Sequence, residues 1–465
     1  MDSARALADL IAFFAQVVKR IFEAVDKLGS EYDARSLESY VEEQMKALGA
    51  VLLETALRLR MKRAAIPDSL PCDCGQRKHC MGKRPKTVRG VLGAIELQER
   101  YYFYCDHCKA AEFLGDELSG ETAFTQLAEE RIALAGKEGA YAKAAQLLKR
   151  LGIIELAGST IRKVCVRLGQ RARAALEHEA AQQLVVDLRP EDHDACLYIG
   201  VDGAMVGRVD PQHRRRSSRH PSRKVRGKTA LKNFFHEVKT LVIFSSNTAG
   251  ELVRKTYYAT QARIEEFREQ VNREAAKRGA GKALQLVFLG DGAPWIWKMA
   301  SELFPKAIQI LDFYHAAEHL WSVARAGLGN DEKRIWAWVA QHTKELKEGK
   351  FDQVLAALRA VSEKLGKPDQ GLSDEARERD PRWIAHRAIG YFEENRARMD
   401  YPRYLALKLS IGSGVVESGC KHLVGARLKG PGMRWDEEGA EDILALRCHD
   451  LNERWDSLWP DKATA

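Results

Sequence analysis

Apolar residues recur with a helical period along the first stretch of the chain. Steps of four and three residues alternate between them, and the charged residues Asp9, Lys19 and Arg20 fall elsewhere. This alternating spacing is that of a coiled-coil seam. The apolar positions are Leu7, Ile11, Phe14, Val18, Ile21, Val25 and Leu28. The pattern predicts a long amphipathic helix with an apolar face.

Two interpretations of this apolar face stay open. One is self-association with a second copy of the chain. The other is packing within its own domain, for which a second helical stretch from Ser36 to Lys62 provides a partner.

Two short apolar runs in the middle of the chain predict buried β-strands. Leu197 to Val201 leads into Asp202, Leu284 to Gly290 leads into Asp291, and each aspartate is followed by glycine. Glycine allows a sharp exit from a strand, so we expect both aspartates at strand ends. Taken singly, either Asp-Gly pair is also what an ordinary turn contains.

The residues around these two runs complete the pattern of a mixed sheet. Further strands are expected at Val238–Ser245, Leu252–Ala259 and Ala307–Leu311, with a helix at Ala262–Arg278 before the Asp291 strand. Strands, a helix and strands in this order fit a ribonuclease-H-like mixed α/β domain.

A third acidic residue, Glu417, lies in a different setting. It follows the glycine-rich segment Ile411–Gly414 and precedes apolar residues at helical spacing, so we expect it on a helix. The long interval between Asp291 and Glu417 is helical in pattern and predicts an all-α insertion. Its apolar anchors are expected to be core residues, with base stacking by a tryptophan as the alternative. They are Trp321, Trp336, Trp338, Leu346, Leu355 and Leu358.

The length of 465 residues allows about three or four domains of roughly 100 to 200 residues each. The patterns together predict a multidomain α+β protein. The expected segments are an N-terminal helical segment at 1–66, a zinc-ribbon-like domain at 67–115, a helical helix-turn-helix-like domain at 116–190, the first part of the ribonuclease-H-like domain at 191–312, the all-α insertion at 313–408 and the second part of the ribonuclease-H-like domain at 409–465.

Basic residues outnumber acidic ones, with 74 Lys plus Arg against 65 Asp plus Glu and a formal charge of +9. Such a balance suits a polyanionic partner. The excess is concentrated between Arg208 and Lys232, where Asp210 is the only acidic residue. In a phosphate-binding flap Arg214, Arg215 and Arg216 would contact DNA, and a solvated loop is the alternative.

The sequence contains no stretch near the roughly 18 uninterrupted apolar residues of a membrane span, and its first residues lack the pattern of a cleavable signal. We expect a cytoplasmic protein without a membrane partner. Nine cysteines are few for a disulfide scaffold in a chain of this length. Clustered cysteines are therefore interpreted first as metal ligands.

Cysteines cluster on both sides of a stretch with strand character, Ala94 to Tyr104. Cys72 and Cys74 precede it, and Cys105 and Cys108 follow it. Two cysteine pairs separated by β-hairpin sequence are typical of a zinc ribbon, in which four thiolates fix a tetrahedral Zn²⁺.

The first cysteine pair departs from the usual knuckle spacing. Only Asp73 separates its two thiols, so His79 and Cys80 remain alternative ligands. A ribbon held together by its apolar residues alone is the other interpretation.

Two helical patterns separated by a short turn follow the cysteine segment. Tyr141–Leu151 leads through Gly152 into Ser159–Cys165. Gly152 can end the first helix and Ser159 can cap the second. In a helix-turn-helix Arg162 and Lys163 would then face outward and contact DNA, and a helical hairpin with a basic solvent face is the alternative.

Asp202, Asp291 and Glu417 together favour metal-dependent phosphoryl transfer. Mg²⁺ prefers hard oxygen ligands and keeps open positions for phosphate oxygens. Two such ions in one site can activate the attacking oxygen and stabilise the leaving oxygen. The three carboxylates therefore indicate an enzyme that uses Mg²⁺ on nucleic acid.

Four blocks of sequence carry a family resemblance. They are Leu289–Trp297, Gln309–Leu320, Ile411–Ser418 and Arg427–Trp435. They resemble signature blocks of bacterial insertion-sequence DDE transposases of the Kra group and, more distantly, eukaryotic Mutator-like enzymes. The resemblance covers roughly Pro71 to Trp459.

The resemblance implies a catalytic triad of Asp202, Asp291 and Glu417, with His315 close to it in a supporting role. It also implies Mg²⁺ or Mn²⁺ as cofactor and the terminal inverted repeats of a mobile element as substrate. Two departures from the family pattern concern the zinc ribbon and the basic segment. Pro71 stands where the first cysteine would fall, and the insert after Asp202 is longer than expected.

The tail beyond Glu417 offers further contacts to DNA. Arg427, Lys429 and Arg434 flank the flexible segment Gly430–Gly432 and are expected to bind phosphates near the active site. The acidic run that begins at Asp436 is interpreted as the first turn of a helix.

The expected reaction is nicking at the ends of an element, followed by attack of the freed 3′-hydroxyl on target DNA. The expected partners are double-stranded DNA and a second copy of the chain in a dimer. Two alternatives stay open: a non-catalytic DNA-binding regulator, and a ribonuclease-H-fold resolvase or repair nuclease that cuts without joining.

Overall fold

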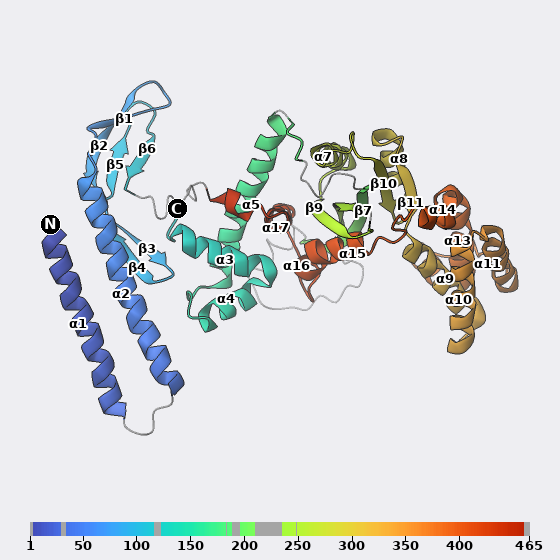
Figure 1. Ribbon diagram of the computed structural model, residues 1–465, viewed down its shortest axis with the longest axis horizontal. Coiled ribbons are helices and arrows are strands. Elements are labelled where there is room, and N and C mark those ends of the chain that lie inside the picture. Colours follow the sequence, from blue (N-terminus) through green and yellow to red (C-terminus); the bar gives the residue numbers. More distant parts are fainter. Residues whose placement is uncertain are drawn as a thin grey trace. The chain divides into compact units, whose positions relative to one another are not determined.

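The computed structural model describes residues 3–28, 34–115, 122–182, 184–187, 196–209, 235–247 and 249–459. The chain divides into two compact units, Met1–Cys165 and Val166–Ala465, whose elements are labelled in Figure 1. The basic segment with Arg214, Arg215 and Arg216 lies outside the described residues. Among the helices that are described, none combines the length and the apolarity that crossing a bilayer requires.

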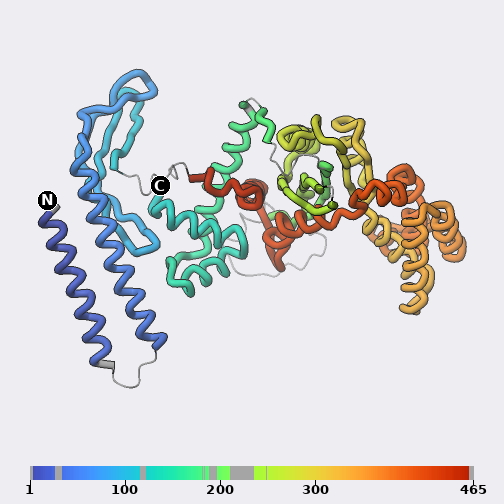
Figure 2. The backbone as a smooth tube through the Cα atoms, viewed as in Figure 1, coloured from blue at the N-terminus to red at the C-terminus, as the bar shows by residue number. Residues whose placement is uncertain are grey.

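The first unit opens with two long helices, α1 (Ser3–Leu28) and α2 (Ala34–Arg63), which lie side by side (Figure 2). Helix α1 buries Ala6 and Val17, each 1% exposed. The predicted seam lies on a neighbouring face instead, because Leu7 and Ile11 are each 59% exposed. The second helical stretch is therefore the intramolecular partner, but it leaves most of the predicted seam uncovered.

Two small antiparallel sheets follow these helices. One has the order β1-β2-β5-β6, and the other is a hairpin of β3 and β4, whose Val88 and Ile95 pack under Ala50 of α2. The strands are β1 (Ser69–Pro71), β2 (Arg77–Lys83), β3 (Lys86–Gly90), β4 (Gly93–Leu97), β5 (Tyr101–Tyr104) and β6 (Ala111–Leu114). The stretch with strand character from Ala94 to Tyr104 thus belongs to two strands of different sheets.

Three helices follow the small sheets: α3 (Gln126–Glu138), α4 (Tyr141–Arg150) and α5 (Gly158–Ala181), of which α5 runs across the boundary of the two units. Gly152 has a positive φ of 62°, as expected of the residue that ends α4. The expected cap is wrong by two residues, because Ala157 accepts hydrogen bonds from Thr160 and Ile161 and so places Ser159 inside the first turn of α5.

The second unit contains a mixed five-stranded sheet of order β11-β10-β7-β8-β9. Strand β8 runs antiparallel to both of its neighbours, whereas β7, β10 and β11 run parallel. The strands are β7 (Cys196–Gly207), β8 (Phe235–Ser246), β9 (Leu252–Thr260), β10 (Gln285–Gly290) and β11 (Ile308–Leu311), with α7 (Ile264–Lys277) and α8 (Pro294–Leu303) between them. The strands predicted from the sequence are confirmed.

Both edges of this sheet are covered by side chains. At the β9 edge, Asn452 accepts the amide hydrogen of Tyr257 at 2.7 Å and donates to its carbonyl at 2.8 Å. At the β11 edge, the hydroxyls of Tyr401 and Tyr404 donate to the carbonyls of Leu311 and Gln309, both at 3.2 Å. The backbone groups of the outer strands are therefore partnered by side chains at these positions.

Every element from Phe313 to Ala406 is a helix. Helix α9 (Phe313–Leu328) packs against α10 (Glu332–Lys347), α11 (Phe351–Leu365) and α13 (Pro381–Asn395). The shorter helices are α12 (Asp374–Arg379), a 3₁₀ turn at Arg396–Arg398 and α14 (Tyr401–Ala406).

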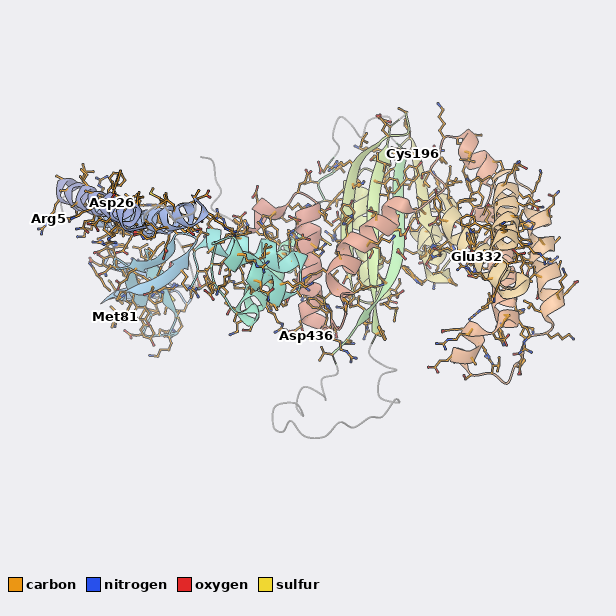
Figure 3. The ribbon with its side chains drawn as sticks, turned by 90° about the horizontal axis from the view of Figure 1, so that it is seen from below. Arg5, Asp26, Met81, Cys196, Glu332 and Asp436 are labelled. Carbon is orange, nitrogen blue, oxygen red and sulfur yellow. The ribbon has the colours of Figure 1, made fainter. Side chains whose placement is uncertain are left out.

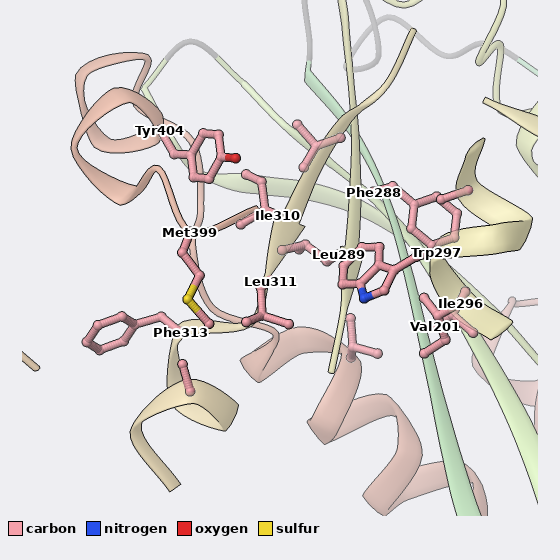
Figure 4. Close-up of a cluster of buried hydrophobic side chains, with 14 of the residues drawn as sticks. Val201, Phe288, Leu289, Ile296, Trp297, Ile310, Leu311, Phe313, Met399 and Tyr404 are labelled. Atoms are coloured by element: carbon pink, nitrogen blue, oxygen red, sulfur yellow. The ribbon is translucent and has the colours of Figure 1, made fainter. Parts of the chain in front are cut away.

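These helices share one apolar core with the sheet. Figure 4 shows Met399 and Tyr404 of the helical part close to Ile310 and Leu311 of β11, all of them buried. Most of the helical part therefore shares its core with the sheet, and a smaller apolar cluster of its own is formed by Ala324, Ile335 and Val339 of α9 and α10.

The last segment of the chain returns to the sheet. Helix α15 (Gly414–Cys420) packs on β7 and β8 and continues through a π-helical turn at Lys421–Gly425 into α16 (Ala426–Leu428). Helix α17 (Glu437–Leu451) packs on β9, and a 3₁₀ turn follows at Trp455–Leu458. Figure 3, in which Asp436 is labelled, shows these C-terminal helices across one face of the long strands.

Candidate functional site

Three aspartates lie at one level across neighbouring parallel strands of the second unit. Leu289 of β10 pairs with Gly200 of β7, so continuing this register by two residues puts Asp291 level with Asp202. Gly290 pairs with Leu311 of β11, which puts Asp291 level with Asp312 as well. The amide of Asp312 donates to the carbonyl of Gly290 at 2.9 Å and confirms this alignment.

Asp202 lies inside β7 and not at its end, contrary to the expectation from the Asp-Gly pair. Beyond Asp202, Ala204 and Val206 are buried while Gly203 and Met205 are exposed, and all of them continue the antiparallel pairing with β8. This alternation is that of a half-buried strand. What ends beside Asp202 is the neighbouring strand β10, so the side chain of Asp202 lies where the parallel part of the sheet stops.

The environment of Asp202 opposes its ionisation. Burial raises the pKa of Asp202, and the negative charge of Asp291 raises it further. The amide of Gly203 donates to its Oδ1 at 2.7 Å and works in the opposite direction. Two carboxylates that repel each other in a partly buried setting form a site that favours a cation.

Asp291 is held by the first turn of α8 and by a tyrosine of α13. Its Oδ1 accepts the amide hydrogen of Ala293 at 3.0 Å, and its carbonyl accepts the Tyr391 hydroxyl at 2.7 Å. Gly292 has a φ of 107°, and a Cβ there would lie 2.4 Å from the Tyr391 ring. The Asp-Gly pair is therefore needed here for its backbone conformation and for the close approach of Tyr391.

Asp312 and His315 form an ion pair beside these aspartates. Nδ1 of His315 lies 3.7 Å from Oδ2 of Asp312, whose side chain is only 4% exposed. The hydrogen bond to Asp312, with the nearby charge of Asp291, raises the pKa of His315 to about 9. The imidazole of His315 thus lies next to Asp312 and within the electrostatic influence of Asp291, and its supporting role stays a prediction.

Glu417 reaches the same strands through α15. Its neighbour Val416 packs on Gly200, where a Cβ would lie 2.0 Å from the valine Cγ2. One turn further along, Cys420 lies close enough to Asp202 for its thiol to hydrogen-bond to the carboxylate. The Glu417 side chain itself is 59% exposed and pairs with Lys421 at 2.6 Å.

The three predicted catalytic carboxylates are therefore on adjoining elements but do not form a closed cluster. Within the described ranges, the four cysteines treated below are the one group of three or more metal-ligating side chains with all donor atoms inside 4.8 Å of one another. Asp202 and Asp291 affect each other electrostatically, whereas Glu417 is turned to Lys421.

The expected DNA-binding residues of the tail differ in exposure. Lys429 and Arg434 are exposed, but Arg427 is 1% exposed and its guanidinium lies 4.6 Å from the centroid of the Trp435 ring. The guanidinium of Arg427 is therefore buried where the expectation has it contact phosphate, and that contact stays a prediction. The indole of Trp435 covers it because Trp435 pairs with the end of β7, where its amide donates to Gly207 at 3.0 Å.

The basic residues of α5 have mixed exposure. Lys163 is exposed and Arg162 is half-buried. The turn before α5 is fixed by two contacts, Lys46 to the carbonyl of Gly152 at 2.6 Å and Arg89 to the carbonyl of Glu155 at 2.7 Å. The geometry allows a helix-turn-helix as well as a helical hairpin.

The four cysteines of the first unit form a compact cluster. The Sγ atoms of Cys72 and Cys108 lie 3.3 Å apart, those of Cys72 and Cys74 3.5 Å, and those of Cys74 and Cys105 3.6 Å. Tetrahedral Zn²⁺ with Zn–S bonds of about 2.3 Å requires sulfur atoms about 3.8 Å apart. The spacing of the four thiols therefore fits a zinc site.

Tight backbone turns compensate for the unusual spacing of the first cysteine pair. Gly75, with a φ of 83°, donates to the carbonyl of Cys72 at 2.9 Å and closes the turn around Cys74. In the second pair, the amides of Cys108 and His107 donate to the thiol of Cys105 and lower its pKa to about 6. Cys80, an alternative ligand from the sequence, is not a member of the cluster.

Some residues of the carboxylate site were missed by sequence reasoning. Asp312 had been assigned no role of its own, although its position directly after a strand matches that of Asp291. No sequence pattern marks Tyr391 as part of the site, because it lies 100 residues beyond Asp291 on a helix of the insertion. Its contact with Gly292 depends on how that helix folds back on the sheet.

Comparison with known proteins gives one family match. Residues 28–368, more than half of the chain, match the Uncharacterised protein family (UPF0236). This range includes the four cysteines, Asp202, Asp291, Asp312 and His315, and it ends before Glu417. None of the curated proteins matches the chain. The protein thus belongs to the Uncharacterised protein family (UPF0236).

Proposed function

We propose that the protein is a DDE transposase that nicks the ends of a mobile DNA element and joins the freed 3′-hydroxyl to target DNA. The observation that carries the proposal is the placement of Asp202 and Asp291 level with each other on parallel strands, with the Glu417 helix packed on the same strands. The family is generally known as the ISLre2-type transposase family, which points the same way. So does the resemblance of four sequence blocks to transposases of the Kra group.

The sheet supports an assignment to the ribonuclease-H-like class. Its order, counted along the chain from β7, is three antiparallel strands followed by two strands parallel to the first. A single helix, α7, connects β9 to β10. This arrangement brings carboxylates from β7 and β10 to one side of the sheet, where a helix can add a third.

The carboxylates fit Mg²⁺ or Mn²⁺ because they are hard oxygen donors on adjacent strands. Bound there, divalent cations would supply the charge that activates a water or 3′-hydroxyl and stabilises the leaving oxygen. Asp202 and Asp291 would hold the cations, and release from Lys421 would let Glu417 join them. His315, positively charged beside them, would stabilise the negative charge of the scissile phosphate.

Basic side chains in each of the two units supply candidate contacts to double-stranded DNA. In the second unit the exposed Lys429 and Arg434 follow the Glu417 helix, and in the first the exposed Lys163 and the half-buried Arg162 lie on α5, the second helix of the helix-turn-helix-like pair. Phosphate contacts of this kind give affinity and register, whereas base contacts give specificity. We assign the tail to the DNA near the scissile bond, and the zinc-ribbon-like sheet and α5 to the terminal repeat.

The uncovered face of α1 supports a homodimer as the working state. Leu7, Ile11 and Phe14 are 59%, 59% and 50% exposed in the 4-3 spacing with which identical helices pack together. Both signs of charge occur on α1, with Arg5 near one end and Asp26 near the other, as labelled in Figure 3. This balance of charge gives no preference for an anionic membrane.

The function is tested by a strand-transfer assay with element-end DNA and Mg²⁺. Asp202→Asn and Asp291→Asn should each abolish nicking and joining while leaving DNA binding intact. Asp374→Asn, at a fully exposed side chain of α12, is the matched control and should keep full activity. Activity retained in both site variants would overturn the proposal.

The same assay separates the proposal from its two rivals. Cleavage of branched DNA without joining would indicate a resolvase or repair nuclease. Binding to DNA without any cleavage, under conditions that keep the protein folded, would indicate a regulator.

A further inference from the structure

The side chain of Asp312 connects three elements at the edge of the carboxylate site. It is the N-cap of α9, where its Oδ1 accepts the amide hydrogen of Tyr314 at 2.8 Å. Its Oδ2 accepts a hydrogen bond from the hydroxyl of Ser413 and lies 3.7 Å from Nδ1 of His315. Both carboxylate oxygens are therefore engaged within the protein.

We propose that Asp312 is a positioning residue that fixes the Glu417 helix to the sheet through Ser413. Ser413 immediately precedes α15, and its carbonyl accepts the amide hydrogen of Glu417 at 2.8 Å. A continuous path thus leads from the Asp312 carboxylate through Ser413 to the backbone of Glu417. The proposal rests on the proposed function in so far as Glu417 is a catalytic ligand.

The segment that leads into α15 is attached to α9 and to β7 at two further points. The amide of Phe313 donates to the carbonyl of Ile411 at 2.9 Å, and the amide of Ser410 donates to the Tyr198 hydroxyl at 3.0 Å. At Gly412 a Cβ would lie 2.5 Å from the Tyr314 ring. This segment fits closely against β11 and α9, so a displacement of Asp312 would be passed on to α15.

Burial makes Asp312 suited to this task and unsuited to binding a cation itself. The residue is 3% exposed, against the intermediate exposure of Asp202 and Asp291. A buried carboxylate that loses a hydrogen-bond partner suffers the full cost of desolvation, so its contacts are strongly held. Asp312 is therefore at the level of Asp202 and Asp291, but its role is to hold neighbouring elements in position and not to bind a cation.

The connection is tested in the full-length protein with three serine variants. Ser413→Ala removes the bond to Asp312, and Ser413→Thr keeps a hydroxyl. Ser410→Ala is the matched control, because Ser410 belongs to the same segment but its hydroxyl donates only to the Gly412 carbonyl, at 3.2 Å. Amide hydrogen exchange of residues 411–420, the binding constant for Mn²⁺ and the rate of DNA nicking are measured for each.

Ser413→Ala should speed exchange in this segment by about two- to tenfold, the range that follows from the loss of one hydrogen bond. It should weaken Mn²⁺ binding and lower the rate of nicking while leaving the DNA dissociation constant unchanged. Ser413→Thr should restore Mn²⁺ binding and the rate of nicking. Ser410→Ala should behave as the unchanged protein.

Equal exchange and equal Mn²⁺ binding in Ser413→Ala and Ser410→Ala would overturn the proposal. Failure of the proposed function looks different, because exchange and metal binding are measured without any reaction. If Ser413→Ala loosens the helix while Asp202→Asn still nicks DNA, the connection stands and the transposase assignment falls.

Discussion

At the scale of single residues, the protein shifts the pKa values of Asp202 and Asp312 in opposite directions. Burial and the charge of Asp291 raise the pKa of Asp202. Burial acts on Asp312 as well, but hydrogen bonds from His315 and Ser413 outweigh it and hold the pKa of Asp312 below its usual range. A bound cation would therefore stabilise the ionised form of Asp202 more than that of Asp312. The negative charge of Asp312 is already stabilised by His315 and Ser413.

Asp202→Asn should stabilise the metal-free protein at neutral pH, because a raised pKa means that the ionised carboxylate opposes folding. The gain in Tm should be on the order of 2 °C. It should shrink as the pH falls through the raised pKa, since Asp202 is then protonated in the folded protein. Thermal unfolding at several pH values without divalent cations measures this, with Asp374→Asn as the control. A lower Tm for Asp202→Asn at neutral pH would contradict the expectation.

Lys421→Met should strengthen the binding of Mn²⁺. Lys421 pairs with Glu417 at 2.6 Å, and both side chains are more than half exposed. Exposed pairs contribute little, so the gain in affinity should be about two- to fivefold. Titration of Mn²⁺ by its paramagnetic signal gives the binding constant, and Lys344→Met, in a similar exposed pair with Glu348, is the matched control. Weaker binding in Lys421→Met would show that the lysine helps to hold Glu417 in place.

The positions of these residues could be predicted from the sequence where the neighbouring residues alone determine the local structure. Asp291 follows a short apolar strand and precedes a glycine with a φ of 107°, so its local sequence was sufficient. Asp202 was found for the same reason but was placed wrongly at a strand end, because Gly203 continues the strand. The pairing of Glu417 with Lys421 and the burial of Arg427 under Trp435 depend on side-chain packing that no spacing reveals.

At the scale of elements, α1 shows how one helix can present two apolar faces. Its 4-3 pattern was correctly read as a helix, but residues such as Ala6 and Val17, outside that pattern, are the ones buried. The half-buried Leu10 and Phe13 lie on the same face as Ala6 and Val17, so α1 carries apolar residues at helical spacing on two neighbouring faces. The face that packs inside the unit was therefore harder to recognise than the face that stays exposed.

Phe14→Glu should weaken self-association. Phe14 is 50% exposed in the middle of the uncovered face, and a charge there would have to be buried in a dimer. The dissociation constant should rise by about tenfold or more. Light scattering across a range of concentrations measures it, and Gln16→Glu, at an exposed polar position of the same helix, is the control. A dimer unaffected by Phe14→Glu would place the contact between copies elsewhere.

At the scale of the whole molecule, the two compact units depend on different sources of stability. The second unit has a large apolar core shared by the sheet and the helices of the insertion. The four-stranded sheet of the first unit is small and has the cysteine cluster at its strand ends. Small domains of this kind commonly need a metal to fold.

Chelation of Zn²⁺ should therefore unfold the sheet that carries the four cysteines and leave the second unit folded. Binding of zinc contributes about 10–16 kcal/mol in small zinc domains, so its loss should be decisive there. Cys105→Ser should reproduce the effect, whereas Cys80→Ser, at a cysteine outside the cluster, should keep one equivalent of zinc. Metal analysis measures the zinc content, and limited proteolysis measures whether the sheet is unfolded. A zinc-free protein that resists proteolysis would indicate a ribbon held by its apolar residues.

Side chains hydrogen-bond to outward backbone groups of both outer strands of the five-stranded sheet, and this affects how the protein can assemble. Asn452 occupies the outward backbone groups of Tyr257, and two tyrosines occupy carbonyls of the opposite outer strand. A strand from another molecule would have to displace these side chains before it could add to the sheet. Fibre-like stacking of copies through the edges of this sheet is therefore disfavoured at these positions.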